Sequence, residues 1–514
     1  MSLATTLDAR LRGHDDENAI ALVSFSGVGR AWSHSSIGGI MFTRQPHFSL
    51  LAAFVGAALI AATAGSARAV QDDREPPTLP DPPVEAVEQT ATPPRPQTLL
   101  SRMLPNGVRI LAQPIDGADH AAILVSFASG SSHDPSDAPG LSRLLDRLLL
   151  TCAADDGPVR ASAQLDERYP AGWNIRSFDV LSVCGLVVPA DQVDGEVERL
   201  AQRLRTLKID DIAIARETDA MEAEMRTLFE ERPLLKPMSW LVAKAFRHDS
   251  GAPRGIDPVR LARLSVDRIQ REWQQRIIGG NVTLVLVGNV ERIGLDAVID
   301  RAFGALPSGS RPDFPVTVHP VGAVTRDIMD SSDLPSKRHH GTAAFFAPAV
   351  THPDHPAFLV LATTLTQYAA GLPGAESRLD FQYNMLLDPR AAYLTPHMWR
   401  FTREGGPAAA LGWWDAHIKK SRKFTHADAK RTLGSLDWQL GAPLRGKVVD
   451  ELGTRPALLY TIAFATAFRS HYGDDAFWEG YRLKLERMDP RDLVAARDTY
   501  FADANRAIFI LKGD

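Results

Sequence analysis

Charged side chains on one face of a leucine-rich helix are the clearest candidates for chemistry in this sequence. Residues 139–150 read PGLSRLLDRLLL, and the helical period places five leucines on one face and Arg143, Asp146 and Arg147 together on the other. Guanidinium and carboxylate groups form strong paired hydrogen bonds, but a guanidinium has no lone pair to offer a metal. Periodicity alone favours a solvated charged face. Leu150, however, falls within the polar stripe, which indicates that another element covers it.

Other kinds of chemistry have little support in the sequence. The chain has 514 residues, 23% of them charged, and a net charge of −5, so it offers no basic field for nucleic acid. It contains neither a phosphate-binding loop nor a G-x-S-x-G nucleophile elbow. His352 and His355 form a close pair, but no carboxylate stands at ligand spacing from them, and we interpret them as solvated loop residues. We therefore expect no replacement metal site.

The elements that must position the charged helix are a mixture of strands and helices. Asn106 and Gly107 predict the turn of a β-hairpin, and an apolar strand follows at 121–127. Long amphipathic helices occur among such strands in both halves of the chain. The sequence therefore predicts an α+β fold in which mainly antiparallel or mixed sheets are covered by helices.

Two regions of the chain look related to each other. Ser265 opens a helical pattern that leads to Asn281, an apolar strand and a glycine, and Asp489 opens the same series through Asn505. Sixteen positions separate the cap residue from the asparagine in both regions. We interpret this as a duplicated domain, so that the fold has two homologous lobes.

The N-terminal part of the chain carries the signals of export. Residues 41–69 combine Arg44, an apolar run too short to favour a membrane span, and an A-x-A triplet ending at Ala69, which is the layout of a cleavable signal peptide. Residues 1–40 are then expected to be a non-native or disordered extension, and the proline-rich segment 70–98 a linker. We expect a periplasmic or secreted protein without stable membrane insertion.

The remaining residues divide into two expected domains, at 99–305 and 321–514, with an interdomain linker at 306–320. Export leads to an oxidising compartment, in which the only two cysteines, Cys152 and Cys184, could form a disulfide. Two buried free thiols are the alternative.

The order of motifs in the first domain resembles the pitrilysin/insulinase family of zinc peptidases, in its mitochondrial-processing-peptidase-like branch. FASGSSHD at 127–134, followed by the charged helix, is similar to the strand, glycine turn and helix that open the family's fold. In the family the helix reads H-x-x-E-H and supplies two zinc ligands and a general base, whereas here it reads R-x-x-D-R. The resemblance covers about residues 100–514 and implies a processing-peptidase-like metallohydrolase fold.

The resemblance also assigns positions to the charged residues. It places Arg143 and Arg147 at the ligand-histidine sites, Asp146 at the general-base site and Glu224, after 76 intervening residues, at the third-ligand site. Two guanidinium groups cannot coordinate zinc and would repel it, so the resemblance implies a degenerate site without zinc or catalysis. Glu217 shares a helix face with Glu224, and we expect both to pair with arginines in a buried charge cluster.

Two further positions resemble contacts to substrate. Asn174 lies in GWNIRS at 172–177, which is similar to the family's edge strand that pairs with substrate backbone. Tyr393 resembles a tyrosine of the second half that contacts substrate, although Leu386 stands where an arginine is expected about seven residues earlier.

Such a degenerate member implies a non-catalytic, substrate-binding subunit of a heteromeric metallopeptidase. Its expected partners are an active zinc-peptidase homologue and extended peptides. A solitary periplasmic peptide-binding or chaperone-like protein is the alternative, and a residual metallopeptidase is a third possibility that zinc content would separate from the other two. A neighbouring gene that encodes an intact H-x-x-E-H protein would favour the subunit.

Overall fold

A computed structural model describes residues 99–155, 157, 162–231, 256–291, 294–311, 326–330, 340–370, 379–384, 388–396, 429–430, 432 and 456–512. The expected extension, signal peptide and first linker, at 1–40, 41–69 and 70–98, lie outside the described residues. So do Leu386 and residues 312–320 of the expected interdomain linker.

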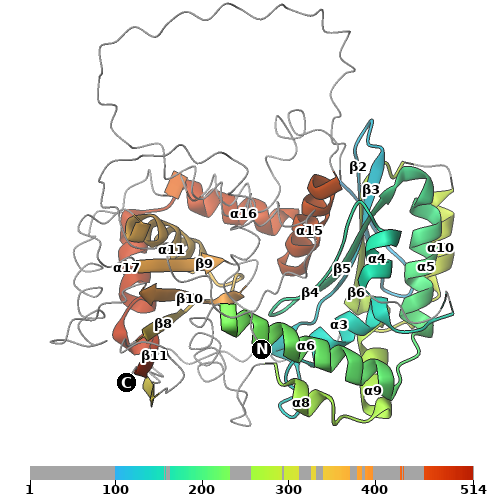
Figure 1. Cartoon of the computed structure of the whole chain (residues 1–514). Coiled ribbons are helices and arrows are strands. Elements are labelled where there is room, and N and C mark those ends of the chain that lie inside the picture. The colour runs from blue at the N-terminus through green and yellow to red at the C-terminus, as the bar shows by residue number, and fades with distance from the viewer. Residues whose placement is uncertain are drawn as a thin grey trace, which may run out of the picture.

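Six strands of the first half form one mixed sheet (Figure 1). In order across the sheet they are β1 (Leu100–Met103), β2 (Arg109–Pro114), β6 (Val282–Gly288), β3 (His120–Phe127), β5 (Ser182–Pro189) and β4 (Trp173–Ser177). β2 and β6 run parallel, and all other neighbours are antiparallel. The predicted Asn106–Gly107 turn joins β1 to β2, and Gly107 has a φ of 97°, in the left-handed region that glycine adopts readily.

Helices cover both faces of this sheet. One face shares a core with α3 (Leu141–Thr151), α4 (Ser162–Arg168), α5 (Val193–Thr206), α6 (Asp211–Glu231), α8 (Pro258–Leu261), α9 (Val266–Arg276) and α10 (Leu295–Gly304). Side chains alternate between the two faces along β3: Ile123 and Val125 belong to this core, whereas Ala122 and Leu124 belong to the core on the other face. Burial on both faces explains why the strands are continuous apolar runs.

The second half forms a five-stranded sheet. Its strands, in order across the sheet, are β7 (Arg326–Asp330), β11 (Arg506–Lys512), β8 (His340–Phe346), β10 (Asp388–Pro396) and β9 (Leu379–Asn384). β7 and β11 run parallel and the other neighbours antiparallel, which repeats the order and directions of β2, β6, β3, β5 and β4. Helices α11 (His355–Ala370), α16 (Asp475–Glu486) and α17 (Pro490–Tyr500) accompany this sheet. The predicted α+β fold with two similar lobes is confirmed.

The duplicated motif has the same local structure in both halves. Ser265 and Asp489 are the N-caps of α9 and α17, and each side chain accepts a hydrogen bond from a backbone N–H of the first turn. Asn281 and Asn505 end the short 3-10 turns η3 (Gly279–Asn281) and η5 (Asp503–Asn505). Each donates 2.8 Å to the carbonyl oxygen of the residue five positions earlier. A central strand of the sheet then follows in each half.

The two halves share a hydrophobic core. Helix α15 (Pro456–Tyr472), from the second half, packs against β3, β5 and β6 of the first sheet, and Figure 1 shows it beside that sheet. A Cβ atom added to Gly185 on β5 would approach Cε2 of Tyr460 on α15 to 2.4 Å, so this contact requires glycine. Within the described ranges, no helix combines the length and the apolar character needed to cross a membrane.

Candidate functional site

Helix α3 is held firmly at both ends. At its start, the buried carboxylate of Asp134 accepts hydrogen bonds from the backbone N–H groups of Gly140 and Ser142, at 2.8 and 2.7 Å. Burial raises the pKa of Asp134 to about 6. At the other end, the fully buried Arg203 donates to the carbonyl oxygens of Leu149 and Cys152. These contacts satisfy helix-terminal backbone groups and fix how α3 presents its polar face.

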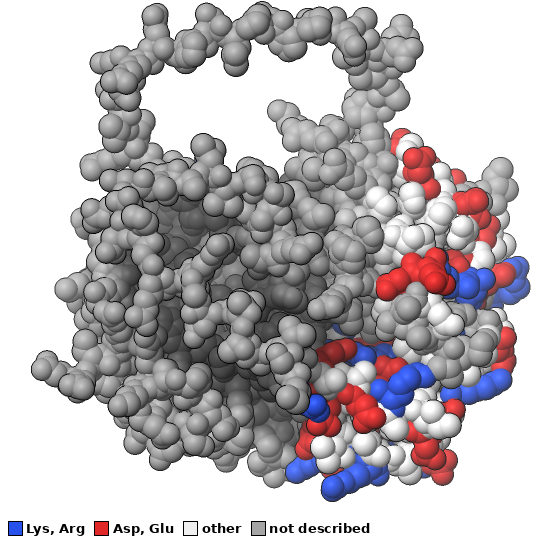
Figure 2. All heavy atoms as spheres, viewed as in Figure 1, with Lys and Arg blue, Asp and Glu red and all other residues white. Residues whose placement is uncertain are grey.

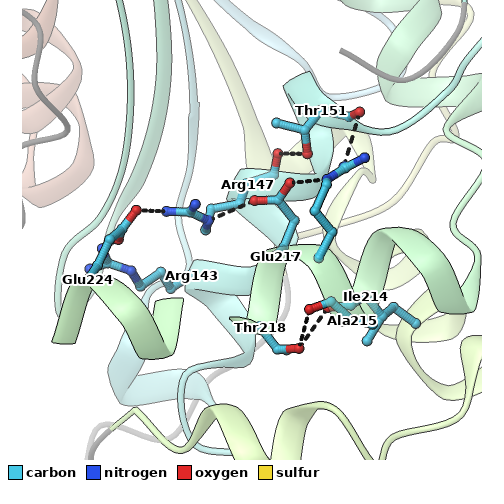
Figure 3. A network of polar contacts seen from close by, with 9 residues as sticks. Arg143, Arg147, Thr151, Ile214, Ala215, Glu217, Thr218 and Glu224 are labelled. Carbon is cyan, nitrogen blue, oxygen red and sulfur yellow. Dashed lines mark hydrogen bonds and ion pairs between the residues drawn. The ribbon is translucent and has the colours of Figure 1, made fainter. Parts of the chain in front are cut away.

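The polar face of α3 meets two glutamates of α6 in a network of ion pairs (Figure 3). Arg147 joins both glutamates: its Nε lies 2.9 Å from Oε2 of Glu217, and its Nη1 lies 2.8 Å from Oε1 of Glu224. Nη2 of Arg143 lies 3.0 Å from the other oxygen of Glu224. The prediction that Glu217 and Glu224 pair with arginines is confirmed. Leu150, which was expected to be covered, is 1% exposed.

Arg216 of α6 extends the network. Its Nε lies 2.9 Å from Oε1 of Glu217, so both oxygens of that carboxylate face a guanidinium, and its Nη2 donates 3.3 Å to the carbonyl oxygen of Thr151 at the end of α3. The Glu217 side chain is 5% exposed, whereas those of Arg143, Arg147 and Glu224 are 17–24% exposed. Glu217 is therefore the buried member of the cluster, and the side chains around it are partly open to solvent.

The pKa values of the two arginines of α3 are shifted in opposite directions. Burial acts to lower the pKa of Arg147, but the charges of Glu224 and Glu217 outweigh it and hold that pKa above its usual value. At Arg143, burial prevails over Glu224, and with the like charge of Arg147 it lowers the pKa. Arg147 is thus the structural centre of the network.

Asp146 takes part in a separate, deeper ion pair. Its Oδ1 lies 2.6 Å from Nη2 of Arg276 on α9, and the two side chains are 3% and 4% exposed. Ser177 at the end of β4 donates to the other oxygen of Asp146. Arg276 also donates to the carbonyl oxygen of Ser142 and lies 4.7 Å from the centroid of the Phe127 ring. The guanidinium of Arg276 therefore engages the carboxylate that the resemblance assigns to the general-base position.

Sequence reasoning missed Arg276, although a signal was present. Ile269, Trp273 and Arg276 follow one another at helical spacing on the buried face of α9. A charged residue at an apolar position of an amphipathic helix indicates a buried partner. Arg203 carries the same signal within α5, where it is fully buried beside Leu200 and Leu204.

The residues at the site do not fit a zinc ion. Guanidinium groups stand at both expected histidine positions, and the two carboxylates of α6 are already engaged by arginines. No group of three or more His, Cys, Asp or Glu side chains with metal-binding geometry occurs in the described part of the chain. The arrangement can hold charge and accept or donate hydrogen bonds, but it supplies no set of zinc ligands.

Other predicted residues fall in different places. Asn174 lies on β4, the terminal strand of the first sheet, as predicted for an edge strand. Tyr393 lies on β10, between β8 and β9, and is therefore not on an edge. His355 is not a solvated loop residue: it is fully buried at the start of α11, with Nδ1 2.6 Å from the hydroxyl of Tyr481. The prediction for His355 was wrong, whereas His352 is exposed as expected.

The disulfide alternative for the two cysteines was also wrong. Cys152 and Cys184 are both free thiols in the structure and both buried. Burial raises the pKa of Cys152 to about 12 and that of Cys184 further. Both thiols are therefore protonated and inert at neutral pH.

The fold is that of a peptidase-like α+β protein, and two arginines lie at the positions where the resemblance implies metal ligands. Comparison with known proteins supports this class. Residues 263–379 match the family model described as peptidase M16 inactive domain. Coenzyme PQQ synthesis protein F of Klebsiella pneumoniae is 30% identical over 153 residues, which are 29% of this chain and 19% of that protein. The match thus spans about a fifth of the length of that relative.

Solved structures show the same fold. A protease from Helicobacter pylori has a TM-score of 0.66 at 14% identity, over 81% of this chain and 99% of that chain. The periplasmic protease PqqL from Escherichia coli has a TM-score of 0.60 at 12% identity, over 82% of this chain and 48% of that chain. The resemblance to pitrilysin/insulinase-type peptidases is confirmed: part of the chain matches an M16 family model, and the chain has the fold of solved M16-type peptidases.

Figure 2 shows one face of the molecule, on which acidic and basic side chains are interspersed over the described surface. No broad basic area is present on the described residues of that face.

Proposed function

We propose that this chain is an exported, catalytically inactive M16 homologue that serves as the substrate-binding subunit of a heteromeric metallopeptidase. Its partner is a homologue with an intact H-x-x-E-H site, and its ligands are extended peptides. The observation that carries the proposal is the network of Arg143, Arg147, Glu217 and Glu224, because ion pairs replace the metal site without disturbing the surrounding fold.

The proposed replacement of the metal by arginines also preserves the charge balance of the site. Two arginine charges stand where a divalent metal and two neutral ligands stand in an active peptidase, so the glutamates of α6 remain compensated. The carboxylate of Asp146 is likewise compensated by Arg276. Loss of the metal therefore leaves no unpaired buried charge among these residues, and the lobe can keep its shape for another use.

Strand β4 supplies a means of holding a peptide without a metal. It is the last strand of its sheet, and one of its sides pairs with β5. The amide of Val187 on β5 donates to the carbonyl oxygen of Gly172, so Gly172 and Val187 form a hydrogen-bonded pair. Hydrogen-bonded and non-hydrogen-bonded pairs alternate between antiparallel strands, so the backbone N–H and C=O groups of Trp173 and Ile175 point away from β5. An extended peptide can add to those groups as a further strand.

The chain of PqqL is about twice as long as the region that this chain matches. This chain aligns with 48% of PqqL, and with 93% of a structure described as the first half of PqqL. One chain of PqqL thus contains about twice as much of this fold. A second, zinc-bearing chain would complete an equivalent pair of halves here, and the periplasmic location of PqqL supports export.

The proposal is tested by reconstitution with an H-x-x-E-H homologue from the same genome. Size-exclusion chromatography at micromolar concentration should show a complex, and the complex should cleave a fluorogenic extended peptide faster than the homologue alone. A homologue whose catalytic glutamate is replaced controls for contaminating peptidases. If the homologue cleaves equally well alone and no complex forms, the subunit role is refuted and the solitary peptide-binding protein is favoured.

A further inference from the structure

Strand β4 has one end that a turn closes and one end that no turn closes. After Ser177 the chain turns directly into β5, and the amide of Phe178 donates 2.7 Å to the carbonyl oxygen of Leu181 within that turn. The other end of β4 begins at Trp173. A strand that is paired on one side only frays most readily at an end that no turn closes. Fraying of β4 should therefore start at Trp173.

This first residue is also one of those proposed to pair with a peptide. The backbone N–H and C=O groups of Trp173 point away from β5, as do those of Ile175. Fraying at Trp173 removes one of the positions at which an added strand forms its hydrogen bonds. The affinity for a peptide therefore depends on how firmly this residue is held.

The side chain of Trp173 ties the open end of β4 to helix α4. The indole ring is buried in the core that lies beneath α3. Its Nε1 donates a hydrogen bond of 3.0 Å to Oδ1 of Asp166 on α4. A hydrogen bond to a carboxylate is stronger than one between neutral groups.

Helix α4 is itself fastened to α5, so Asp166 is held in place. Nη2 of Arg168 lies 3.1 Å from Oε1 of Glu196 on α5. The hydroxyl of Tyr169, the residue that follows α4, donates 3.1 Å to the other oxygen of the same carboxylate. Glu196 and Tyr169 are both buried, which strengthens these contacts. The chain of contacts thus runs from α5 through α4 to the open end of β4.

We propose that Trp173 and Asp166 are positioning residues, which hold the open end of β4 extended so that a peptide meets a preformed edge. The inference rests on the proposed peptide-binding function and adds the contact that prepares its binding strand. An edge that is already ordered spares the complex the entropy cost of ordering it on binding. Both side chains act through the backbone of β4 and not by touching the ligand.

The test combines hydrogen–deuterium exchange with peptide binding, both on the full chain. Mass spectrometry follows exchange in fragments that cover β4. Fluorescence anisotropy measures binding of a decapeptide of alternating serine and valine with a neutral N-terminal fluorophore and a C-terminal amide. The same decapeptide with N-methylated backbone amides shows whether binding uses strand addition.

The variants separate the hydrogen bond from the bulk of the side chains. Trp173→Phe removes the donor and Asp166→Ala the acceptor, so each should speed exchange in β4. Each should also weaken binding about fivefold, which corresponds to about 1 kcal/mol, the net value of one hydrogen bond. Asp166→Asn keeps an acceptor oxygen and should retain most of the protection and most of the affinity.

Trp273→Phe is the matched control within the same lobe. The indole of Trp273 on α9 donates 3.2 Å to the carbonyl oxygen of Leu204 on α5, so this variant also loses one indole hydrogen bond. It should lower stability in urea, yet leave both exchange in β4 and peptide affinity unchanged. A purely structural role of Trp173 predicts instead that the two tryptophan variants behave alike in all three measurements.

The outcomes that overturn the inference differ from those that overturn the proposed function. If the wild type binds the decapeptide and Asp166→Ala binds it equally well, the inference is wrong while peptide binding stands. Equal loss in Asp166→Ala and Asp166→Asn also overturns it, because the hydrogen bond is then not the cause. If the wild type binds no decapeptide, or binds the N-methylated form as tightly, strand addition fails and the inference fails with it. The side chain of Asp166 is exposed, so its variants decide the matter even where Trp173→Phe does not fold.

Discussion

The buried pair of Asp146 and Arg276 should contribute strongly to the stability of the first lobe. The charged groups lie 2.6 Å apart, and each side chain is less than a twentieth exposed. Removal of one partner leaves the other charge buried without compensation, which costs about 3–5 kcal/mol. In Arg276→Met, the lost contact with the Phe127 ring adds about 1 kcal/mol to that cost. We expect Arg276→Met to lower the free energy of unfolding by about 5 kcal/mol.

The pairing, rather than the size of the side chains, should cause this loss. Asp146→Leu combined with Arg276→Met replaces both charges by apolar groups of similar volume, and it should be less destabilised than either single variant. Urea unfolding followed by circular dichroism measures all three variants. The control is the exposed pair of Glu222 and Arg226, which lies in solvent at 3.2 Å and should contribute about 0.5 kcal/mol or less.

The outcome that would refute this reasoning is a small and additive effect. If Arg276→Met and Asp146→Leu each cost less than about 1 kcal/mol, and the double variant costs their sum, the two charges do not interact in the folded protein. The carboxylate at the general-base position would then be available to solvent, and the interpretation of this position as locked would fail.

Three further predictions concern metal, thiols and pH. Because Arg143 and Arg147 are expected at the positions of the two zinc-binding histidines, metal analysis by mass spectrometry should find no stoichiometric zinc. About one tightly held zinc per chain would contradict this prediction. Cys152 and Cys184 should both react with an alkylating reagent after denaturation without reductant, since both are free thiols; absence of labelling would indicate a disulfide. The pKa of Asp134, raised to about 6, means that the folded state binds this proton more tightly than the unfolded chain. Protonation of Asp134 should therefore raise the free energy of unfolding by about 1 kcal/mol as the pH falls from about 7 to 5. Asp134→Asn should abolish that part of the pH dependence in urea unfolding.

Local patterns were enough to predict much of the fold. The helical spacing of the leucines predicted α3, and the Asn106–Gly107 pair predicted the first hairpin. The shared spacing of Ser265 to Asn281 and Asp489 to Asn505 indicated the duplication. These features depend on contacts between residues close in the chain, or on caps that need particular side chains. These features can therefore be predicted without knowledge of tertiary packing.

Long-range partners could be predicted only where charge and spacing left few choices. Glu217 and Glu224 share a helix face, and the family resemblance placed Glu224 opposite the two arginines of α3, so their pairing could be inferred from charge. Arg276 is 130 positions from Asp146, and the sequence alone offers many carboxylates for it. His355 was misjudged because its burial depends on α16, whose Tyr481 arrives from far along the chain.

The contact between Gly185 and Tyr460 has a consequence for how the duplicated halves evolved. Helix α15 belongs to the second half by sequence, yet it closes one face of the first sheet, over Leu124 and Val285. A gene shortened at 306–320 would encode a first lobe with that apolar face bare to water, which favours aggregation. We therefore expect the two halves to stay together in one chain, even where their sequences have diverged.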